Sequence, residues 1–291
     1  MKQKLLISFS GGETSAYMTY KLLQTLDRDK WRIIVVFANT GKEREETLEF
    51  IKQCDERFGF NTHWVECVTN PEYRKGVSAK RVTFEKASRK GEPFKESIRK
   101  HGISNTQMSM CTRELKTRTI EAYLRKLGWK DYHRAIGIRI DEIDRINDKH
   151  KELRIIYPCV SMFPSRKEDI NLFWMQQDFR LNLKSYQGNC DCCFKKSLRK
   201  LLTIAVEEPE RFDWWAEIEE EFGDYIPETR TYNGEKQTFF RGNLSAKEIL
   251  EMSKGFKEFA TDERFNISKQ LTFAGFELDT PNGCSESCEA W

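Results

Sequence analysis

Short apolar runs and helix-like apolar stripes alternate in the first part of the chain. Residues 5–9 and 33–38 are continuous apolar runs, and the second of them is rich in β-branched side chains. Such runs are typical of strands that are buried on both faces. After each run, apolar residues recur every three or four positions, which predicts an amphipathic helix. Residues 62–68 form a third candidate strand, so the order predicts a parallel sheet with right-handed crossovers.

The rest of the chain is predicted to be mainly helical. Residues 112–127 carry an apolar stripe that ends at Gly128, and glycine is common just after a helix. A further strand is expected at 132–138, and helices are expected at 169–179, 195–206 and 209–222. We therefore predict an α/β fold, with a doubly wound parallel sheet in residues 1–160 and a helical C-terminal region in residues 161–291.

Charge is distributed unevenly, although the net charge is only +3. Residues 71–106 contain ten lysines or arginines and four acidic residues. We interpret this block as an insertion that lies over the functional site of the sheet. Residues 207–228 contain ten acidic residues and one arginine. A basic block of this kind is suited to phosphates or nucleic acid, but it is also compatible with a solvated surface loop.

The composition indicates a cytoplasmic protein with a substantial core. Hydrophobic residues make up 38% of the chain, but no stretch approaches the roughly 20 apolar residues that span a bilayer. The apolar part of the N-terminus is also too short for a signal peptide. Nine cysteines in such a protein point to metal, cluster or redox chemistry rather than to a disulfide framework.

A Ser-Gly-Gly loop, Ser10 to Gly12, joins the first predicted strand to the first helix. Glycines allow a phosphate to approach the backbone closely, and the free N–H groups at a helix start attract anions. The loop lacks the Gly-Lys-Ser/Thr of the lysine-bearing nucleotide loop. A plain glycine turn is the alternative interpretation.

The sequence SFSGGETSAYM, followed by VVFANTGKEREET, resembles the PP-loop superfamily and, within it, the phosphoadenosine phosphosulfate (PAPS) reductase family. The resemblance implies that an adenine nucleotide, either ATP or PAPS, is bound. Glu13-Thr14 stands where many ATP-cleaving members have Lys-Asp, so a role for Mg²⁺ stays open. The implied phosphate-binding residues are Ser10, Gly11, Gly12, Thr14 and Ser15, and the residues implied to border the adenine are Phe37, Ala38 and Asn39.

Residues 137–145 resemble a second element of this family, GxRxxExxR. Arg139 follows a predicted strand, and open parallel sheets bind ligands at the carboxyl ends of their strands. The planar guanidinium fork suits phosphate or sulfate, and Glu142 is expected to orient it. A surface ladder of ion pairs is the alternative interpretation.

Cys190 and Cys193 form a CxxC motif, whose two sulfurs can reach one metal centre. With Cys111 they resemble the cysteine pattern of assimilatory adenylylsulfate reductases, which hold a 4Fe–4S cluster. The resemblance implies Cys111, Cys190 and Cys193 as ligands. Met110 stands where those enzymes have another cysteine, so we assign Cys284 as the fourth ligand. The alternatives are Cys159, Cys192 or Cys288 as fourth ligand, an open iron, a structural zinc, or thiols without metal.

Three hypotheses follow for function. The first is a PP-loop enzyme that cleaves ATP at the α–β bond and adenylates an acceptor, either nucleic acid or a small molecule, in sulfur-transfer chemistry. The second is a PAPS or adenylylsulfate reductase that releases sulfite and depends on a thiol reductant protein. The tail lacks the Glu-Cys-Gly motif of such reductases, which favours the first. The third is a non-catalytic module that binds nucleotide or nucleic acid. The sequence gives no indication of the oligomeric state.

Overall fold

The computed structural model describes residues 2–227 and 236–262 of the 291-residue chain. The described residues form two compact units. Unit 1 comprises residues up to 97 together with 111–182, and unit 2 comprises residues 98–110 together with those from 183 onward. Each unit is therefore assembled from separate stretches of the chain.

Unit 1 is built on a six-stranded sheet whose strand order is β4-β3-β2-β1-β5-β6. Neighbouring strands are parallel except for the edge strand β4, which is antiparallel to β3. The strands are β1 (Gln3–Ser8), β2 (Trp31–Asn39), β3 (His63–Thr69), β4 (Val77–Val82), β5 (His133–Ala135) and β6 (Ile155–Ile156).

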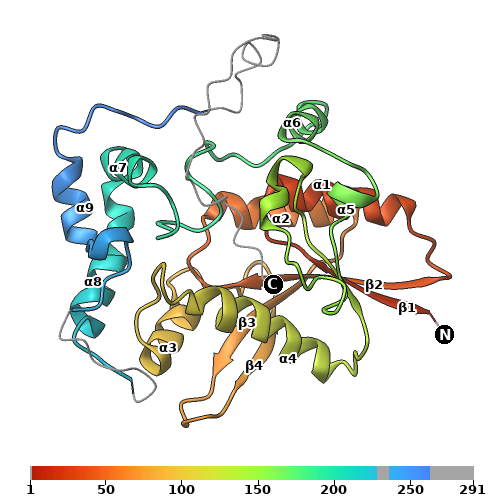
Figure 1. Ribbon diagram of the computed structural model, residues 1–291, viewed down its shortest axis with the longest axis horizontal. Helices are drawn as coiled ribbons and strands as arrows, with labels where there is room; N and C mark the ends of the chain where they lie inside the picture. Colours follow the sequence, from red (N-terminus) through yellow and green to blue (C-terminus); the bar gives the residue numbers. More distant parts are fainter. Residues whose placement is uncertain (1, 228–235, 263–291) are drawn as a thin grey trace. The chain divides into compact units, whose positions relative to one another are not determined.

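Helices cover both faces of this sheet, as the sequence predicted. Figure 1 shows α1 (Glu13–Thr25) and α2 (Glu45–Phe58) on one face and α4 (Thr119–Lys126) on the other. The doubly wound α/β fold is confirmed. The remaining helices of unit 1 are η1 (Cys111–Arg118), η2 (Ile140–Arg145), α5 (Pro158–Ser161) and α6 (Lys167–Met175), and α3 (Glu92–His101) crosses the boundary between the units.

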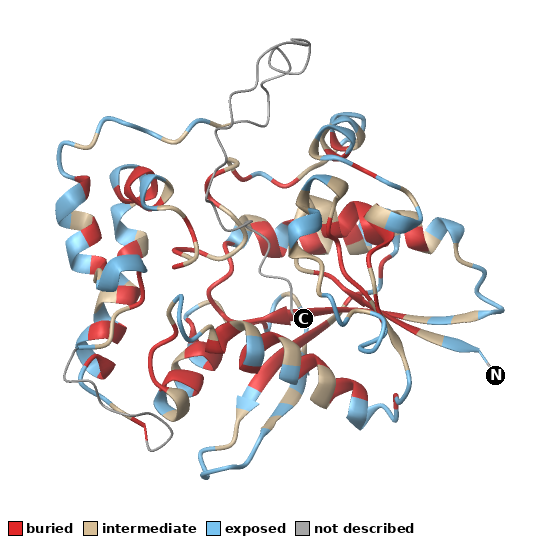
Figure 2. Cartoon of the chain, viewed as in Figure 1, coloured by how far each residue is buried: buried red, intermediate tan, exposed pale blue. Residues whose placement is uncertain are grey.

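Two hydrophobic layers hold the sheet of unit 1. On one face, Leu6, Val36 and Val65 pack against Leu124 of α4. On the side of α1 and α2, Trp174 of α6 is buried, and the centroid of its ring lies 5.0 Å from that of Phe50 on α2. Figure 2 shows the buried strands between helices whose outer sides are exposed. No helix in the described part of the chain has the length and apolar character needed to cross a membrane.

The predicted insertion at 71–106 contains β4, a loop and α3. Glu66 of β3 is fully buried and tethers this segment to the sheet. Its carboxylate accepts hydrogen bonds from Asn39 Nδ2 at 2.7 Å and from the backbone N–H and hydroxyl of Ser88. Lys80 Nζ of β4 lies 2.8 Å from the same carboxylate. The buried Glu66 carboxylate thus links the first part of the basic block to Asn39 at the end of β2.

Unit 2 contains the helices expected at 195–206 and 209–222. They are α7 (Leu198–Glu207), η3 (Pro209–Phe212) and α8 (Asp213–Phe222), followed by η4 (Arg241–Asn243) and α9 (Ala246–Ser253). Trp215 of α8 is fully buried, and its ring centroid lies 4.8 Å from that of Phe239. The Trp214–Trp215 pair therefore helps to pack this unit.

A buried glutamate joins α8 to α9 in unit 2. Glu219 accepts hydrogen bonds from the backbone N–H of Phe239 at 2.9 Å and of Ala246 at 2.7 Å. Ala246 is the first residue of α9, so the carboxyl group satisfies one of that helix's free N–H groups. Burial raises the pKa of Glu219 to about 7, although the two N–H donors act in the opposite direction.

We expect unit 2 to lose stability as the pH rises toward neutrality. The folded pKa of Glu219, about 7, exceeds its ordinary value of 4.5, so its stabilisation is complete below the ordinary value and is lost as the pH rises through about 7. Between pH 5 and 7 this amounts to about 2 kcal/mol. Denaturant unfolding followed by tryptophan fluorescence would measure it. Glu219→Gln should flatten the profile, whereas Glu220→Gln, at an exposed neighbour paired with Lys247, should leave it unchanged.

Candidate functional site

The carboxyl end of β1 lies where the strand order of unit 1 reverses. From β1 the chain moves through α1 to β2 on one side, and it later returns to β5 on the other side of β1. The loops that follow β1 and β5 therefore face each other at this edge. Open α/β sheets bind ligands at such a switch point. The Ser-Gly-Gly loop follows β1, and Arg139 follows β5.

The loop after β1 is held by its own hydroxyl groups. Ser10 Oγ and Ser15 Oγ are 2.9 Å apart, and the Ser15 hydroxyl donates to the carbonyl oxygen of Gly12 at 2.9 Å. Gly12 is the N-cap of α1, and it provides no side-chain hydrogen bond to the N–H groups at the start of the helix. The first turn of α1 therefore presents backbone N–H groups and the positive end of the helix dipole, which together favour a phosphate.

Gly11 has a structural reason to be glycine. Its φ is +83°, a region that L side chains rarely adopt. A Cβ at this position would lie 2.6 Å from Cγ2 of Thr47 and 2.9 Å from Cδ1 of Ile51, both on α2. The missing side chain thus lets α2 pack against the loop. The sequence analysis considered phosphate approach and the conformational freedom of glycine, but not this packing against α2.

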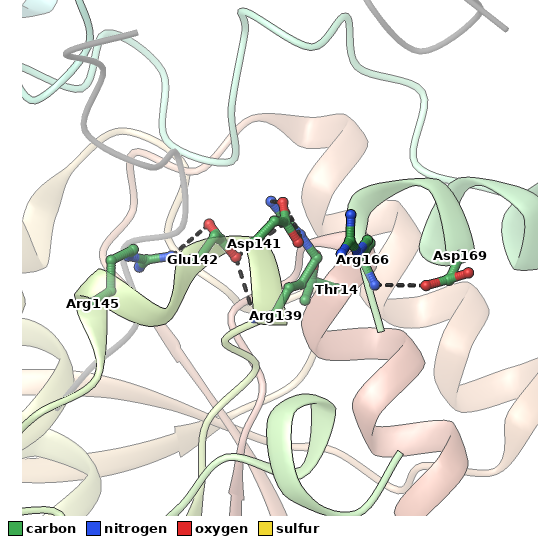
Figure 3. Close-up of polar contacts among 7 residues, drawn as sticks. All are labelled: Thr14, Arg139, Asp141, Glu142, Arg145, Arg166 and Asp169. Atoms are coloured by element: carbon green, nitrogen blue, oxygen red, sulfur yellow. Dashed lines mark hydrogen bonds and ion pairs between the residues drawn. The ribbon is translucent and has the colours of Figure 1, made fainter. Parts of the chain in front are cut away.

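Arg139 connects the two loops. Its Nη1 donates to Thr14 Oγ1 in the first turn of α1 at 3.1 Å, across 125 positions of sequence. The same guanidinium donates to Asp141 and forms an ion pair with Glu142 at 3.3 Å (Figure 3). Arg145 pairs with Glu142 at 2.8 Å. The predicted partnership of Arg139 and Glu142 is therefore present in the geometry, and Arg139 lies against the Ser-Gly-Gly helix.

The acids around Arg139 keep it charged and in place. Burial lowers the pKa of Arg139, but the hydrogen bonds to Asp141 and the charges of Asp141 and Glu142 outweigh this effect and raise it. Burial likewise raises the pKa of Asp141, and Arg139 more than offsets that rise, so the pKa lies below its usual range. An ion pair therefore occupies the position at which an anionic ligand is expected.

The residues expected to border an adenine lie at the end of β2. Phe37 is buried, and its ring packs edge-on against Trp64 with centroids 5.0 Å apart. Ala38 is buried as well. The Asn39 amide donates to Glu66 and to the Ser88 carbonyl oxygen, while its Oδ1 accepts from the N–H of Gly41. Since these side chains are engaged within unit 1, an adenine at this place would meet chiefly their backbone.

The turn after β2 contains buried charges that the sequence analysis did not single out. Glu43 caps the turn, because it accepts hydrogen bonds from the N–H of Thr40 at 2.8 Å and from its hydroxyl. Lys116 of η1 lies 3.7 Å from Glu43, and both side chains are almost fully buried. The Thr-Gly turn followed by acids was the available signal, but the distant Lys116 could not be paired with it from sequence.

Comparison with known families identifies the N-terminal part of this site. Residues 4–106 match the phosphoadenosine phosphosulfate reductase domain. The resemblance predicted from the sequence is confirmed over these residues. The matched PAPS reductase segment runs from β1 into the region after α3, so it includes the Ser-Gly-Gly loop and the end of β2. Arg139 and the cysteines from Cys111 onward lie beyond it.

Two relatives extend the similarity past the PAPS reductase segment. An uncharacterized nin region protein of Escherichia phage lambda is 27% identical over 298 residues, which cover 97% of this chain and 93% of that protein. An uncharacterized protein of Methanocaldococcus jannaschii is 21% identical over 233 residues, which cover 77% of this chain and 43% of that protein. The similarity thus extends over nearly the whole chain in the first case.

The predicted metal ligands are distributed over both units. Cys111 is the first residue of η1 in unit 1, and Cys190 and Cys193 are partly buried in unit 2. Cys192 is fully buried, and its sulfur faces the Arg211 carbonyl oxygen at 3.6 Å. Within the described ranges, no three His, Cys, Asp or Glu side chains are grouped as a metal site. Cys284 and Cys288 lie outside the described residues.

Proposed function

We propose that this protein is a PP-loop enzyme of the PAPS reductase kind that binds ATP and cleaves it between the α and β phosphates. The reaction would adenylate an acceptor in sulfur-transfer chemistry. The observation that carries the proposal is the hydrogen bond from Arg139 to Thr14, at 3.1 Å, beside the uncapped start of α1. It joins a guanidinium fork to a glycine-loop helix at the switch point of the sheet.

The residues of unit 1 have distinct roles in this proposal. The N–H groups at the start of α1 bind phosphate oxygens, and Arg139 neutralises charge that develops on them. An oxygen nucleophile of the acceptor attacks the α phosphorus, the bond to the bridging oxygen breaks, and pyrophosphate leaves with the electron pair. Asp141 and Glu142 hold Arg139 in the orientation that this step requires.

The match to the PAPS reductase domain supports a second candidate reaction. There a thiolate would attack the sulfur of PAPS, the sulfur–oxygen bond would break, and adenosine bisphosphate would leave. A thiol reductant would then release sulfite from the S-sulfo-cysteine. This reaction uses the same phosphate site and needs a nucleophilic thiol.

One pair of assays separates the candidates. The purified chain should be incubated with ATP and, separately, with PAPS and a dithiol reductant. Pyrophosphate formation from ATP, stimulated by a nucleic-acid or small-molecule acceptor, is the expected result. Sulfite formation from PAPS without pyrophosphate from ATP would replace the proposal by the reductase reaction. Nucleotide binding without either product would indicate a non-catalytic module.

The proposal includes a 4Fe–4S cluster that would be held by cysteine thiolates. Cys190 and Cys193 supply two thiolates from one loop of unit 2, and Lys196 donates to the Cys190 carbonyl oxygen at 3.3 Å. Thiolates of this spacing suit iron–sulfur clusters and also zinc. Cys111 and Cys284 are the proposed remaining ligands. Because the described residues do not complete a metal site, we assign the cluster no step in the reaction.

We expect protein purified without oxygen to be brown and to contain about four irons per chain. Cys190→Ser and Cys193→Ser should each remove the colour and most of the iron. Cys54→Ser should retain both, because Cys54 is buried on α2 and far in sequence from the CxxC. Absorbance spectra with iron and zinc analysis would decide. Stoichiometric zinc without visible absorbance would contradict the assignment.

A further inference from the structure

Glu13, the first residue of α1, is bound by an arginine from a distant part of unit 1. Arg180 donates from Nε to Glu13 Oε1 at 2.9 Å and from Nη2 to Oε2 at 3.0 Å. Less than a fifth of either side chain is exposed. The indole N–H of Trp174 also donates to the Glu13 carbonyl oxygen at 3.0 Å. The segment after α6 is therefore attached to the start of the glycine-loop helix.

The two residues at the start of α1 each contact a guanidinium group. Arg180 donates hydrogen bonds to the Glu13 carboxylate, and Arg139 donates one to the Thr14 hydroxyl. Both arginines are also matched to carboxylates, since Asp141 and Glu142 surround Arg139. Positive charge is thus concentrated at the end of α1 that already attracts anions, and carboxylates from the chain itself balance it.

The Glu13 carboxylate uses the same forces that a phosphate would use. It lies in the first turn of α1, where the helix dipole stabilises negative charge, and it accepts a two-pronged guanidinium bond. A phosphate bound at these N–H groups would be repelled by Glu13 at close range. The same phosphate could accept the fork of Arg180 equally well, because carboxylate and phosphate present similar oxygen geometry.

We propose that Arg180 is a nucleotide-binding residue and that Glu13 competes with the ligand for it. In the free protein the Glu13 carboxylate holds Arg180 at the loop. When the ligand binds, the Arg180 guanidinium exchanges Glu13 for a phosphate or sulfate oxygen. The competition favours ligands with several negative charges, such as a nucleoside triphosphate or PAPS, over a monophosphate. This inference rests on the proposed nucleotide site and adds a specificity-determining pair to it.

The competition makes opposite predictions for the two partners. Arg180→Ala should weaken binding of ATP or PAPS at least tenfold. Glu13→Gln should raise the affinity for ATP or PAPS severalfold and the affinity for AMP by a larger factor. The substitution removes the competing carboxylate and keeps the shape of the side chain. The double variant should bind about as weakly as Arg180→Ala alone, since Glu13 would act only through Arg180.

A purely structural ion pair would behave differently. It would give lower thermal stability in both variants and no gain in affinity in either. The neighbouring pair Arg57–Asp178 offers a matched control, because it too joins the segment after α6 to a helix of unit 1, here α2, but is largely exposed. Asp178→Asn should change neither affinity nor specificity.

Isothermal titration of the full chain with ATP, PAPS, AMP and inorganic pyrophosphate would test the inference, with a melting curve for each variant. A gain in affinity for Glu13→Gln together with a loss for Arg180→Ala supports it. Ligand binding that neither substitution alters by more than twofold overturns it and leaves the nucleotide site intact. If the wild-type chain binds only pyrophosphate, with the expected changes, the competition between Glu13 and the ligand for Arg180 is supported for a polyphosphate, and the proposed nucleotide function fails. Binding of none of the ligands overturns both.

Discussion

Gly11→Ala is expected to destabilise the protein by about 2–5 kcal/mol. Part of this cost comes from the positive φ of +83°, which is unfavourable for any residue with a Cβ. The larger part comes from overpacking, because the new methyl group would lie 2.6 Å from Thr47 Cγ2. The predicted effect is a fall in unfolding free energy and in melting temperature, measured without any nucleotide.

Two further variants separate these contributions. Gly59, which ends α2, has φ of +66°, and no atom lies within 4 Å of the place that a methyl group would take, so Gly59→Ala should cost only the backbone strain. Thr47→Ser removes the methyl group that the new Cβ would strike. Gly11→Ala should therefore cost less in the Thr47→Ser background than alone. Equal costs in both backgrounds would mean that packing against α2 is not the reason for this glycine.

Arg139→Ala is expected to weaken nucleotide binding by about 3 kcal/mol, or roughly a hundredfold. The substitution removes charge-assisted hydrogen bonds to the ligand, deprives Asp141 of its Arg139 partner and leaves Glu142 paired with Arg145. Arg139→Lys should be nearly as damaging, because an ammonium group cannot reproduce the planar fork. Titration calorimetry with ATP and with PAPS would measure both variants.

A second substitution in the same element provides the comparison. Arg145→Ala also removes a partner of Glu142 but leaves Arg139 and its bond to Thr14 in place. It should weaken binding much less. Full affinity in Arg139→Lys would show that Arg139 supplies only diffuse charge, and the two-loop site would then lose its main support.

The parts of the site that sequence could predict are those encoded locally. A strand, a Ser-Gly-Gly turn and an amphipathic helix follow one another within the first segment, so their order reveals the loop. Arg139 was singled out because it directly follows the strand expected at 132–138, although β5 ends at Ala135, and the carboxyl ends of parallel strands share one edge. Phosphate binding by Gly11 stays a prediction, and its packing role could not be predicted, since only the approach of Thr47 on α2 reveals it.

The parts that sequence could not predict depend on distant partners. Glu66 lies within an apolar strand, and its burial makes sense only because Asn39, Ser88 and Lys80 satisfy it. Arg180 meets Glu13 across 167 positions, and no periodicity reports such a pair. Likewise, one apolar stripe predicted a single helix at 112–127, whereas the chain forms the π-helix η1 and then α4. The two helical windings differ too little to be distinguished by spacing.

The division of the chain has a practical consequence for dissecting the protein. Residues 98–110 belong to unit 2, although residues of unit 1 flank them in the sequence. A fragment that ends at residue 182 would keep this excursion and lose the remainder of unit 2, leaving Ile98 and Ile103, both now buried, without most of their unit. Such a fragment is a candidate for aggregation. Isolating unit 1 therefore calls for replacing residues 98–110 by a short polar linker as well as shortening the C-terminal end.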